Sequence, residues 1–157
     1  MAGLSSVEFR QACAKFATGV AVITAVAGDG SPHGMTVNSF TSVSLEPPLV
    51  LVCIERQAAI LPLLAPGAHF GISVLSEQQK QLSVQFSQKG DRFNGVAWLT
   101  GETGVPLLRG AIATFEAKIV RLLEAGDHII VLAEAVHLTT SEGNPLLFYG
   151  SRYRILG

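Results

Sequence analysis

The sequence is short of charge. Only 15% of its 157 residues are Asp, Glu, Lys or Arg, whereas 48% are hydrophobic; the charged fraction of an ordinary soluble domain is about 25%. A small domain with so few charges leaves apolar surface to cover, so we expect a subunit interface; the alternative is a monomer with an unusually apolar core. The net charge is −1 and the cations are scattered, which excludes the basic stripe of a nucleic-acid-binding protein.

Other absences exclude further classes of protein. The sequence has no run of about 18 apolar residues, so no transmembrane helix is predicted. The segment MAGLSSVEFRQAC has no apolar signal core. We therefore expect a cytoplasmic protein without a membrane partner. Two cysteines, Cys13 and Cys53, do not make a disulfide framework or a metal site; their apolar neighbours predict that they are buried as small hydrophobic side chains. The histidines lack metal-ligand spacing, so no metal is expected.

Motifs of catalysis are missing as well. The chain has no GxSxG, no cysteine with a histidine signature, no paired carboxylates of a glycosidase, no GxGxxG and no GxxxxGK[ST]. We therefore expect no catalytic side chain. If the chain is an enzyme, it binds and orients a cofactor that supplies the chemistry.

Periodicity and turn signals predict a chain made mostly of strands. No linker or repeat divides it, so we expect a single domain over residues 1–157. Strands are predicted at 20–27, 33–37, 42–45, 49–54, 69–75, 111–125 and 128–138, and helices at 6–17, 55–65 and 76–87. Because the strands do not alternate regularly with helices, the fold class predicted is mainly β, an antiparallel barrel with short flanking helices.

The stretch TVNSFTSVSLEPPLVLVCI, residues 36–54, places hydroxyl and amide side chains directly before an apolar strand. Such groups can hold a phosphate or the polar edge of a flat heterocycle, and they are equally usual in a solvated loop. The residues alone leave both readings open. By the same reasoning His128 is an ordinary surface residue, Arg92 a surface cation beside Phe93, and Tyr149 and Tyr153 packing residues at a barrel rim.

A resemblance changes that balance. The segments HGMTVNSFTSVSLEPPLVLVCI (33–54), DRF (91–93), AGDHIIVLAEAV (125–136) and PLLFYGSRYR (145–154) occur in this order, preceded by FRQACAKFATGVAVITA (9–25). The chain resembles the short-chain flavin reductase family, the reductase components of two-component flavin monooxygenases. The resemblance implies a split antiparallel β-barrel of the FMN-binding type, usually a homodimer, which reduces FMN or FAD with NADH or NADPH and supplies reduced flavin to a partner monooxygenase.

The resemblance also implies a site. Residues 35–39 would line the isoalloxazine, residues 53–56 and those just after would meet the ribityl and phosphate side, and the GDH turn would meet the nicotinamide. The flavin-binding residues implied are His33, Gly34, Met35, Thr36, Val37, Asn38, Ser39, Ser42, Ser44, Cys53, Ile54, Glu55, Arg56, Ala59, Phe86, Arg92 and Phe93. The nicotinamide-binding residues implied are Gly126, Asp127, His128, Tyr149 and Tyr153.

One departure from the family pattern affects the phosphate contacts. Many relatives carry small hydroxyl residues where this chain has ERQAA, residues 55–59. Arg56 could take the phosphate as a charged donor, whereas Glu55 would repel it unless it points away. The residues do not decide whether the flavin is FMN or FAD, nor whether the reductant is NADH or NADPH.

The implied mechanism asks little of the side chains. Hydride passes from nicotinamide C4 to flavin N5, so the protein has to stack two flat rings about 3–3.5 Å apart and to place donors near flavin N1 and O2, where negative charge develops. The same residues would serve a flavin-binding electron-transfer protein with tightly held FMN, or a non-enzymatic flavin-binding module. The GDH turn favours the reductase, because the module would have no nicotinamide to meet.

Overall fold

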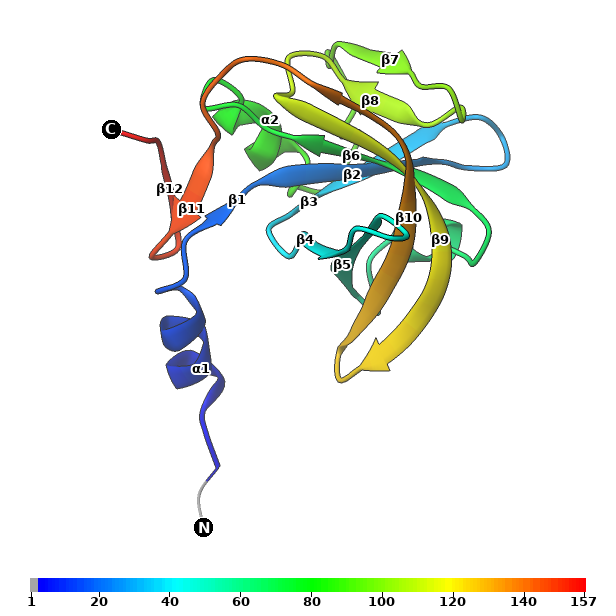
Figure 1. The fold of residues 1–157 in the computed structure, drawn as a ribbon. Coiled ribbons are helices and arrows are strands. Elements are labelled where there is room, and N and C mark those ends of the chain that lie inside the picture. The colour runs from blue at the N-terminus through cyan, green and yellow to red at the C-terminus, as the bar shows by residue number, and fades with distance from the viewer. Residues whose placement is uncertain (1–2) are drawn as a thin grey trace.

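A seven-stranded antiparallel sheet forms the body of the molecule (Figure 1). The computed structural model describes residues 3–157; Met1 and Ala2, part of the expected domain, lie outside the described residues. Along the sheet the strands are β3 (Pro32–Val37), β2 (Ala21–Val26), β6 (His69–Val74), β9 (Ala113–Ala125), β10 (His128–Thr140), β5 (Leu49–Glu55) and β4 (Thr41–Ser44). Each neighbouring pair is antiparallel.

The sheet is curled, because its two edge strands follow each other in the chain. β3 and β4 stand at opposite ends of the strand order, yet only residues 38–40 separate them. Four Cα steps of about 3.6 Å each allow at most about 14 Å between Val37 and Thr41. The two edges therefore meet at a seam without pairing, which confirms the predicted fold class, a split and mainly β barrel.

The remaining elements are two short sheets and three short helices. One short sheet joins β1 (Thr18–Gly19), β11 (Leu147–Tyr149) and β12 (Arg152–Arg154), and another joins β7 (Trp98–Thr100) and β8 (Pro106–Leu108). The helices are α1 (Ser6–Cys13), α2 (Lys80–Gln85) and the 3-10 turn η1 (Leu61–Leu63). Within residues 3–157 no helix is long and apolar enough to cross a membrane.

Strand β2 separates two apolar cores. Its side chains alternate between the faces of the sheet: Ile23 belongs to a cluster inside the barrel, and Val22 to a second cluster between the sheet and the outer elements. The second cluster contains Phe86, just after α2, which is fully buried. The segment that follows α2 is thus packed firmly against the barrel.

Several sequence predictions were wrong in detail. Residues 55–65 do not form the predicted α-helix. They form a series of turns that ends in η1, and each turn is closed by a hydrogen bond between residues three apart. The reasons are that Pro62 lacks an N–H and that the side chains of Ile60 and Leu64 are buried in the core. The predicted helices 6–17 and 76–87 shorten to Ser6–Cys13 and Lys80–Gln85, and β7 and β8 were missed. Cys13 is exposed and Cys53 half-buried, so neither is the buried residue that we expected.

A buried carboxylate ties the β7–β8 turn to strand β9. Glu116 is 4% exposed and accepts hydrogen bonds from the backbone N–H of Glu102 at 3.2 Å and from the N–H and hydroxyl of Thr103 at 2.7 and 2.6 Å. A Cβ on Gly101 would lie 2.5 Å from the carboxylate, so this approach needs glycine. Burial raises the pKa of Glu116, but these hydrogen bonds outweigh burial and leave the pKa below its ordinary value of 4.5.

We predict that Glu116→Gln lowers the free energy of unfolding at pH 7 by about 1–3 kcal/mol, because a charged acceptor of several donors is lost. A lowered folded-state pKa stabilises the protein above the unfolded-state pKa, and this contribution disappears as the pH falls through the folded value. The difference in the free energy of unfolding between wild type and variant should therefore narrow below pH 4.5. Urea unfolding between pH 3 and 7 measures this, with exposed Glu102→Gln as the control; a gap that does not change with pH would contradict it.

Candidate functional site

A cavity of about 640 Å³ opens beside the seam, between β3 and the end of β5. We call it the seam cavity. Its size is ordinary for a small-molecule site. It is lined by Met35, Thr36, Val37, Asn38, Ser39, Cys53, Glu55, Gln57, Ala58, Ala59, Phe86, Ser87, Lys89, Arg92 and His128. The lining thus comes from β3, the link to β4, the end of β5 and the turns after it, the segment after α2 and the start of β10.

Ser39 completes the wall of the cavity on the β5 side. Strand β4 pairs with Leu49–Leu51 and then ends, so the outer edge of β5 is free beyond that point. The Ser39 hydroxyl takes over there: it accepts from the N–H of Cys53 at 2.9 Å and donates to its carbonyl at 3.1 Å. The hydroxyl proton of Ser39 is therefore committed to the protein backbone and not to a ligand.

The edge of β3 is covered by α2. The N–H of Thr36 donates to the carbonyl of Phe86 at 3.1 Å, and its hydroxyl donates to the carbonyl of Ser83 at 2.6 Å. The Ser83 hydroxyl in turn lies 2.6 Å from the hydroxyl of Tyr153 on β12. These bonds satisfy an edge strand that would otherwise be open, and they fix the position of the loop that follows α2.

Gly34 and Arg92 close the same edge further along. The Arg92 guanidinium donates from Nη1 to the carbonyl of Gly34 at 2.8 Å and from Nε to the carbonyl of Gln88 at 2.6 Å. A Cβ on Gly34 would lie 2.8 Å from the ring of Phe86. Glycine therefore lets the ring lie on the strand. The remaining N–H groups of the guanidinium are available at the cavity.

The link between β3 and β4 presents backbone donors. Within residues 3–157 the structure gives the N–H groups of residues 38–40 no protein acceptor. The side chain of Asn38, which lines the seam cavity, is exposed. Backbone N–H groups left outside the hydrogen-bonding ladder are strong donors, so the link can hold the electron-rich edge of a ligand.

His128 stands at the other side of the seam cavity, at the start of β10 opposite Glu55 of β5. Its Nδ1 lies 2.7 Å from the carboxylate of Asp127. This hydrogen bond and the charge of His128 hold the pKa of Asp127 below its ordinary value, so the carboxylate stays ionised at neutral pH. Asp127 thereby fixes the imidazole through Nδ1, and Nε2 is the ring nitrogen left for a ligand.

Arg56 does not line the seam cavity. Its N–H donates to the carbonyl of Asp127 at 3.1 Å, its Nε to the carbonyl of Gly126 at 2.8 Å, and its Nη1 lies 3.3 Å from Glu124. The guanidinium therefore supports the β9–β10 turn. Lys89 and Arg92 are the cations that line the cavity, together with the carboxylate of Glu55.

The structure brings eleven of the residues implied by the resemblance together in the seam cavity: Met35, Thr36, Val37, Asn38, Ser39, Cys53, Glu55, Ala59, Phe86, Arg92 and His128. His33, Gly34 and Phe93 line a neighbouring cavity of about 590 Å³. Tyr153 lines a smaller one of about 170 Å³ that also touches Thr36 and Asn38. The others line none of these cavities: Ser42, Ser44, Ile54, Arg56, Gly126, Asp127 and Tyr149.

The positions outside the cavities have physical reasons. Ser42 and Ser44 belong to β4, where it pairs with β5, and the side chain of Ile54 is fully buried in the barrel core. Sequence reasoning missed the lining residues Ser87 and Lys89, and it included Gln57 and Ala58 only as residues just after 53–56 without naming them. A signal existed for Lys89, since it is a cation directly before the glycine and the DRF motif.

Comparison with known proteins identifies the family. The model of the flavin reductase like domain matches residues 13–157. The FMN reductase (NADH) SmoA of Agrobacterium fabrum is 41% identical over 151 residues, which are 96% of this chain and 86% of that protein. The NADH-dependent flavin reductase StyB of Pseudomonas fluorescens is 42% identical over 153 residues, 96% of this chain and 89% of that protein.

A solved structure gives the same result. The NADH:FAD oxidoreductase of Streptomyces globisporus in complex with NAD and FAD fragments superposes with a TM-score of 0.91 at 40% identity, covering 99% of this chain and 98% of that one. The sequence likeness and the fold thus agree over nearly the whole length. The chain belongs to the flavin reductase like domain family, as its motifs predicted.

Proposed function

We propose that this chain reduces FMN or FAD with NADH and that the seam cavity holds the isoalloxazine. The predicted enzyme class, a NAD(P)H:flavin oxidoreductase, and the predicted cofactors are confirmed by relatives named NADH-dependent FMN and FAD reductases. The observation that supports the location is the link between β3 and β4: Asn38 and Ser39 line a cavity of about 640 Å³, and within residues 3–157 their N–H groups have no protein acceptor.

The residues of the seam cavity fit a flavin. A bound flavin supplies the redox chemistry by accepting hydride from the nicotinamide. Because the hydroxyl protons of Thr36 and Ser39 are committed to backbone carbonyls, the polar edge of the ring is left to the Asn38 amide and the N–H groups of the link. Donors placed there stabilise the negative charge that develops on reduction.

We assign the phosphate to other residues than the sequence suggests. Arg56 is bound to the β9–β10 turn, so we assign the phosphate to Lys89 and Arg92, which line the seam cavity. Arg92 is the better placed of the two, because two hydrogen bonds already fix its guanidinium and little side-chain entropy remains to be lost.

The nicotinamide side is assigned to His128. It lines the seam cavity from the strand opposite β3 and is held by Asp127. Tyr149 and Tyr153, also implied by the resemblance, have less support: Tyr149 lies on β11 outside the cavities, and the hydroxyl of Tyr153 is engaged with Ser83. No side chain need donate or remove a proton in the hydride step, and the protein's part is alignment.

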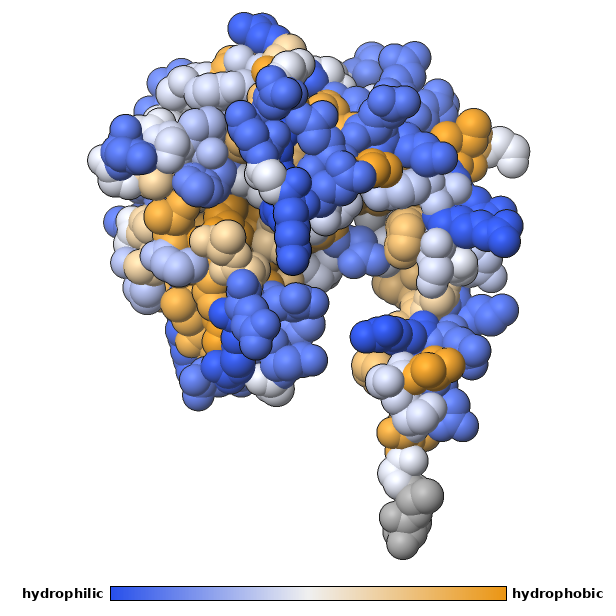
Figure 2. Space-filling view, turned by 180° about the vertical axis from the view of Figure 1, so that it is seen from behind, coloured by the Kyte–Doolittle hydropathy of each residue, from blue (hydrophilic) through white to orange (hydrophobic). Residues whose placement is uncertain are grey.

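We also infer a homodimer. Helix α1 projects from the body and buries no residue (Figure 1), although Leu4, Phe9 and Phe16 on this arm are 82, 61 and 79% exposed. Figure 2 shows apolar side chains along the arm and on the lower part of the body. A helix of eight residues is too short to be stable alone. A second copy that covers the arm would supply the missing packing.

The wider setting follows from the relatives. They include the reductase component of a trigonelline monooxygenase and the flavin reductase of a styrene monooxygenase. We infer that this chain likewise supplies reduced flavin to a partner monooxygenase, that it acts in the cytoplasm, and that residues 1–157 function as one flavin reductase-like domain.

Measuring NADH oxidation by the purified protein, with and without added FMN or FAD, tests the proposed function. We expect oxidation that depends on added flavin and saturates with it, because the open seam cavity lets flavin enter and leave. Oxidation without added flavin would instead indicate a tightly held FMN and an electron carrier. No oxidation of NADH or NADPH with either flavin would leave a non-enzymatic flavin-binding module.

We predict that His128→Ala raises the KM for NADH by about tenfold, equivalent to about 1.4 kcal/mol of binding, and leaves the Kd for flavin within about twofold. The reason is that His128 lines the cavity from β10, whereas the flavin is assigned to the link that joins β3 and β4. Steady-state kinetics and flavin titration measure the two quantities. His137→Ala, an exposed histidine on the same strand, is the control. An unchanged KM for NADH in His128→Ala would rule out this role.

A further inference from the structure

One carboxylate lines the seam cavity. Of the residues that the structure describes, 3–157, Glu55 is the only acidic residue in that lining. It is exposed, and it takes part in neither of the two ion pairs found among these residues. A carboxylate that the protein leaves unpaired is available to a ligand in the cavity.

The backbone around Glu55 is fixed, so its side chain has a definite direction. Glu55 is the last residue of β5 and pairs with His128, the first residue of β10. Its carbonyl accepts from the N–H of Ala58 at 3.0 Å, and the N–H of Arg56 donates to the carbonyl of Asp127 at 3.1 Å. Residues directly opposite each other on neighbouring strands present their side chains on the same face. Glu55 and His128 therefore line the seam cavity together.

The wall of the cavity formed by β5 and β10 is acidic. Besides Glu55, the adjoining β9–β10 turn holds Asp127, whose hydrogen bond with His128 lowers its pKa and keeps its carboxylate ionised at neutral pH. The cation of this region, Arg56, is paired with Glu124. Because that pair balances its own charge, the wall keeps a net negative charge.

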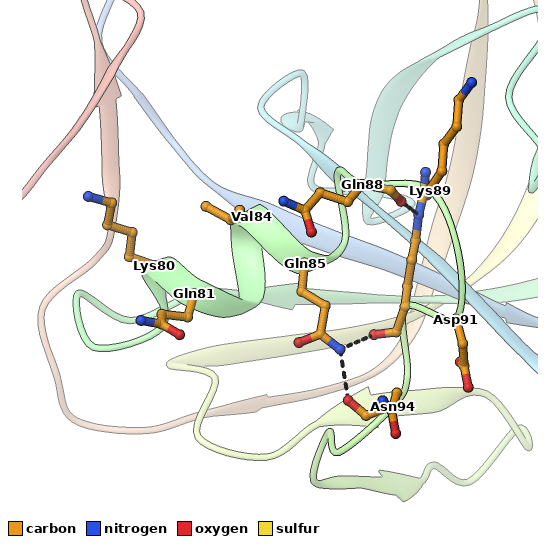
Figure 3. Close-up of a pocket in the computed structure, with 9 residues that line it drawn as sticks. Lys80, Gln81, Val84, Gln85, Gln88, Lys89, Asp91 and Asn94 are labelled. Atoms are coloured by element: carbon orange, nitrogen blue, oxygen red, sulfur yellow. Dashed lines mark hydrogen bonds between the residues drawn. The ribbon is translucent and has the colours of Figure 1, made fainter.

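The wall formed by β3 and the segment after α2 is basic. Lys89 and Arg92 line the cavity from there, and Arg92 is bonded to the carbonyl of Gly34 on β3. Asp91, the carboxylate of the same segment, is not part of the lining, and Figure 3 shows it pointing away from Lys89. The cavity is therefore polarised, with negative charge at the end of β5 and positive charge towards β3.

Hydride transfer separates charge in the same sense. Loss of a hydride, one proton with two electrons, from C4 leaves the nicotinamide ring positively charged, and its transfer to N5 leaves a negative charge on the flavin. We propose that Glu55 faces the nicotinamide ring and stabilises the positive charge as it develops, so that Glu55 is a catalytic residue of the hydride step. The inference rests on the proposed function, which places the nicotinamide at His128, the cross-strand partner of Glu55.

The charge of the ring distinguishes this role from simple binding. The nicotinamide ring is neutral in NADH and positive in NAD⁺, so a carboxylate beside it favours the oxidised form. An interaction that strengthens along the reaction accelerates the chemical step, whereas one that is equal for both forms does not. Glu55 would repel a phosphate, and this role accounts for the presence of its carboxylate at the cavity.

The direct test is calorimetric titration of the purified, flavin-free protein with NAD⁺ and with NADH, each alone. We expect Glu55→Gln to weaken the binding of NAD⁺ about fivefold, equivalent to about 1 kcal/mol, and that of NADH by less than about twofold. Glu55→Asp keeps the charge and should keep most of the preference. Equal effects of Glu55→Gln on both nucleotides, or no binding of NAD⁺ at millimolar concentration, would overturn the proposal.

Glu134→Gln is the matched control. It removes the same charge from β10, at a position that does not line the seam cavity. At about 3.3 Å per residue it lies about 20 Å along the strand from His128, where salt screens its charge. Both dissociation constants should stay within about twofold of those of the wild type. A loss of the preference for NAD⁺ as large as that in Glu55→Gln would count against a local contact.

A double variant and rapid kinetics separate a direct role from an indirect one. Adding Glu55→Gln to His128→Ala should still weaken NAD⁺ more than NADH; if the difference disappears, the carboxylate acts through the imidazole and the direct contact is overturned. In stopped-flow experiments at saturating NADH, Glu55→Gln should slow flavin reduction up to about fivefold and leave the KM for NADH within about twofold. A raised KM with an unchanged rate would contradict the role in the hydride step.

Failure of this proposal and failure of the proposed function give different results. Flavin-dependent oxidation of NADH that Glu55→Gln leaves unchanged would overturn the role of Glu55 and leave the reductase function intact. A wild-type protein that binds neither NADH nor NAD⁺, and oxidises no NADH with either flavin, would overturn the reductase function itself.

Discussion

The short link between β3 and β4 is the constraint on which the rest of the structure depends. It joins the two edges of one seven-stranded sheet with only residues 38–40. The sheet must therefore curl until its edges are within reach of each other, and the seam stays unpaired because the link itself occupies it. An unpaired seam leaves backbone donors exposed next to a hollow, which is the condition for binding a flat polar ring.

The polar residues around the seam divide into those that build the cavity and those that face it. Ser39 replaces a strand partner for Cys53, and Thr36 anchors α2 against β3. Asn38, between them, is exposed at the cavity. The run of hydroxyls before strand β5 is thus explained largely by the need to satisfy backbone groups at two sheet edges. The specific recognition of a ligand falls to fewer groups.

Local sequence pattern predicted the fold well where a segment's partners are its chain neighbours. The strands at 113–125 and 128–140 pair across a Gly126-Asp127 turn, and their alternation was visible in the sequence. The segment 55–65 was read wrongly as a helix, because its apolar spacing fits a helix while Pro62 and the burial of Ile60 and Leu64 decide otherwise. Distant partners also decided the position of Arg56, whose side chain bonds to the β9–β10 turn. Lys89 was missed although it directly precedes Gly90 and the DRF motif; it lines the seam cavity together with residues far away in the sequence.

The most direct test of this account is a crystal structure of the protein with oxidised flavin bound. The account predicts that the isoalloxazine lies in the seam cavity, with its pyrimidine edge within hydrogen-bonding distance of the N–H groups of residues 38–40. The phosphate of the flavin nucleotide should lie beside Arg92. A flavin bound elsewhere, or one whose pyrimidine edge turns away from the link and toward solvent, would contradict the central claim.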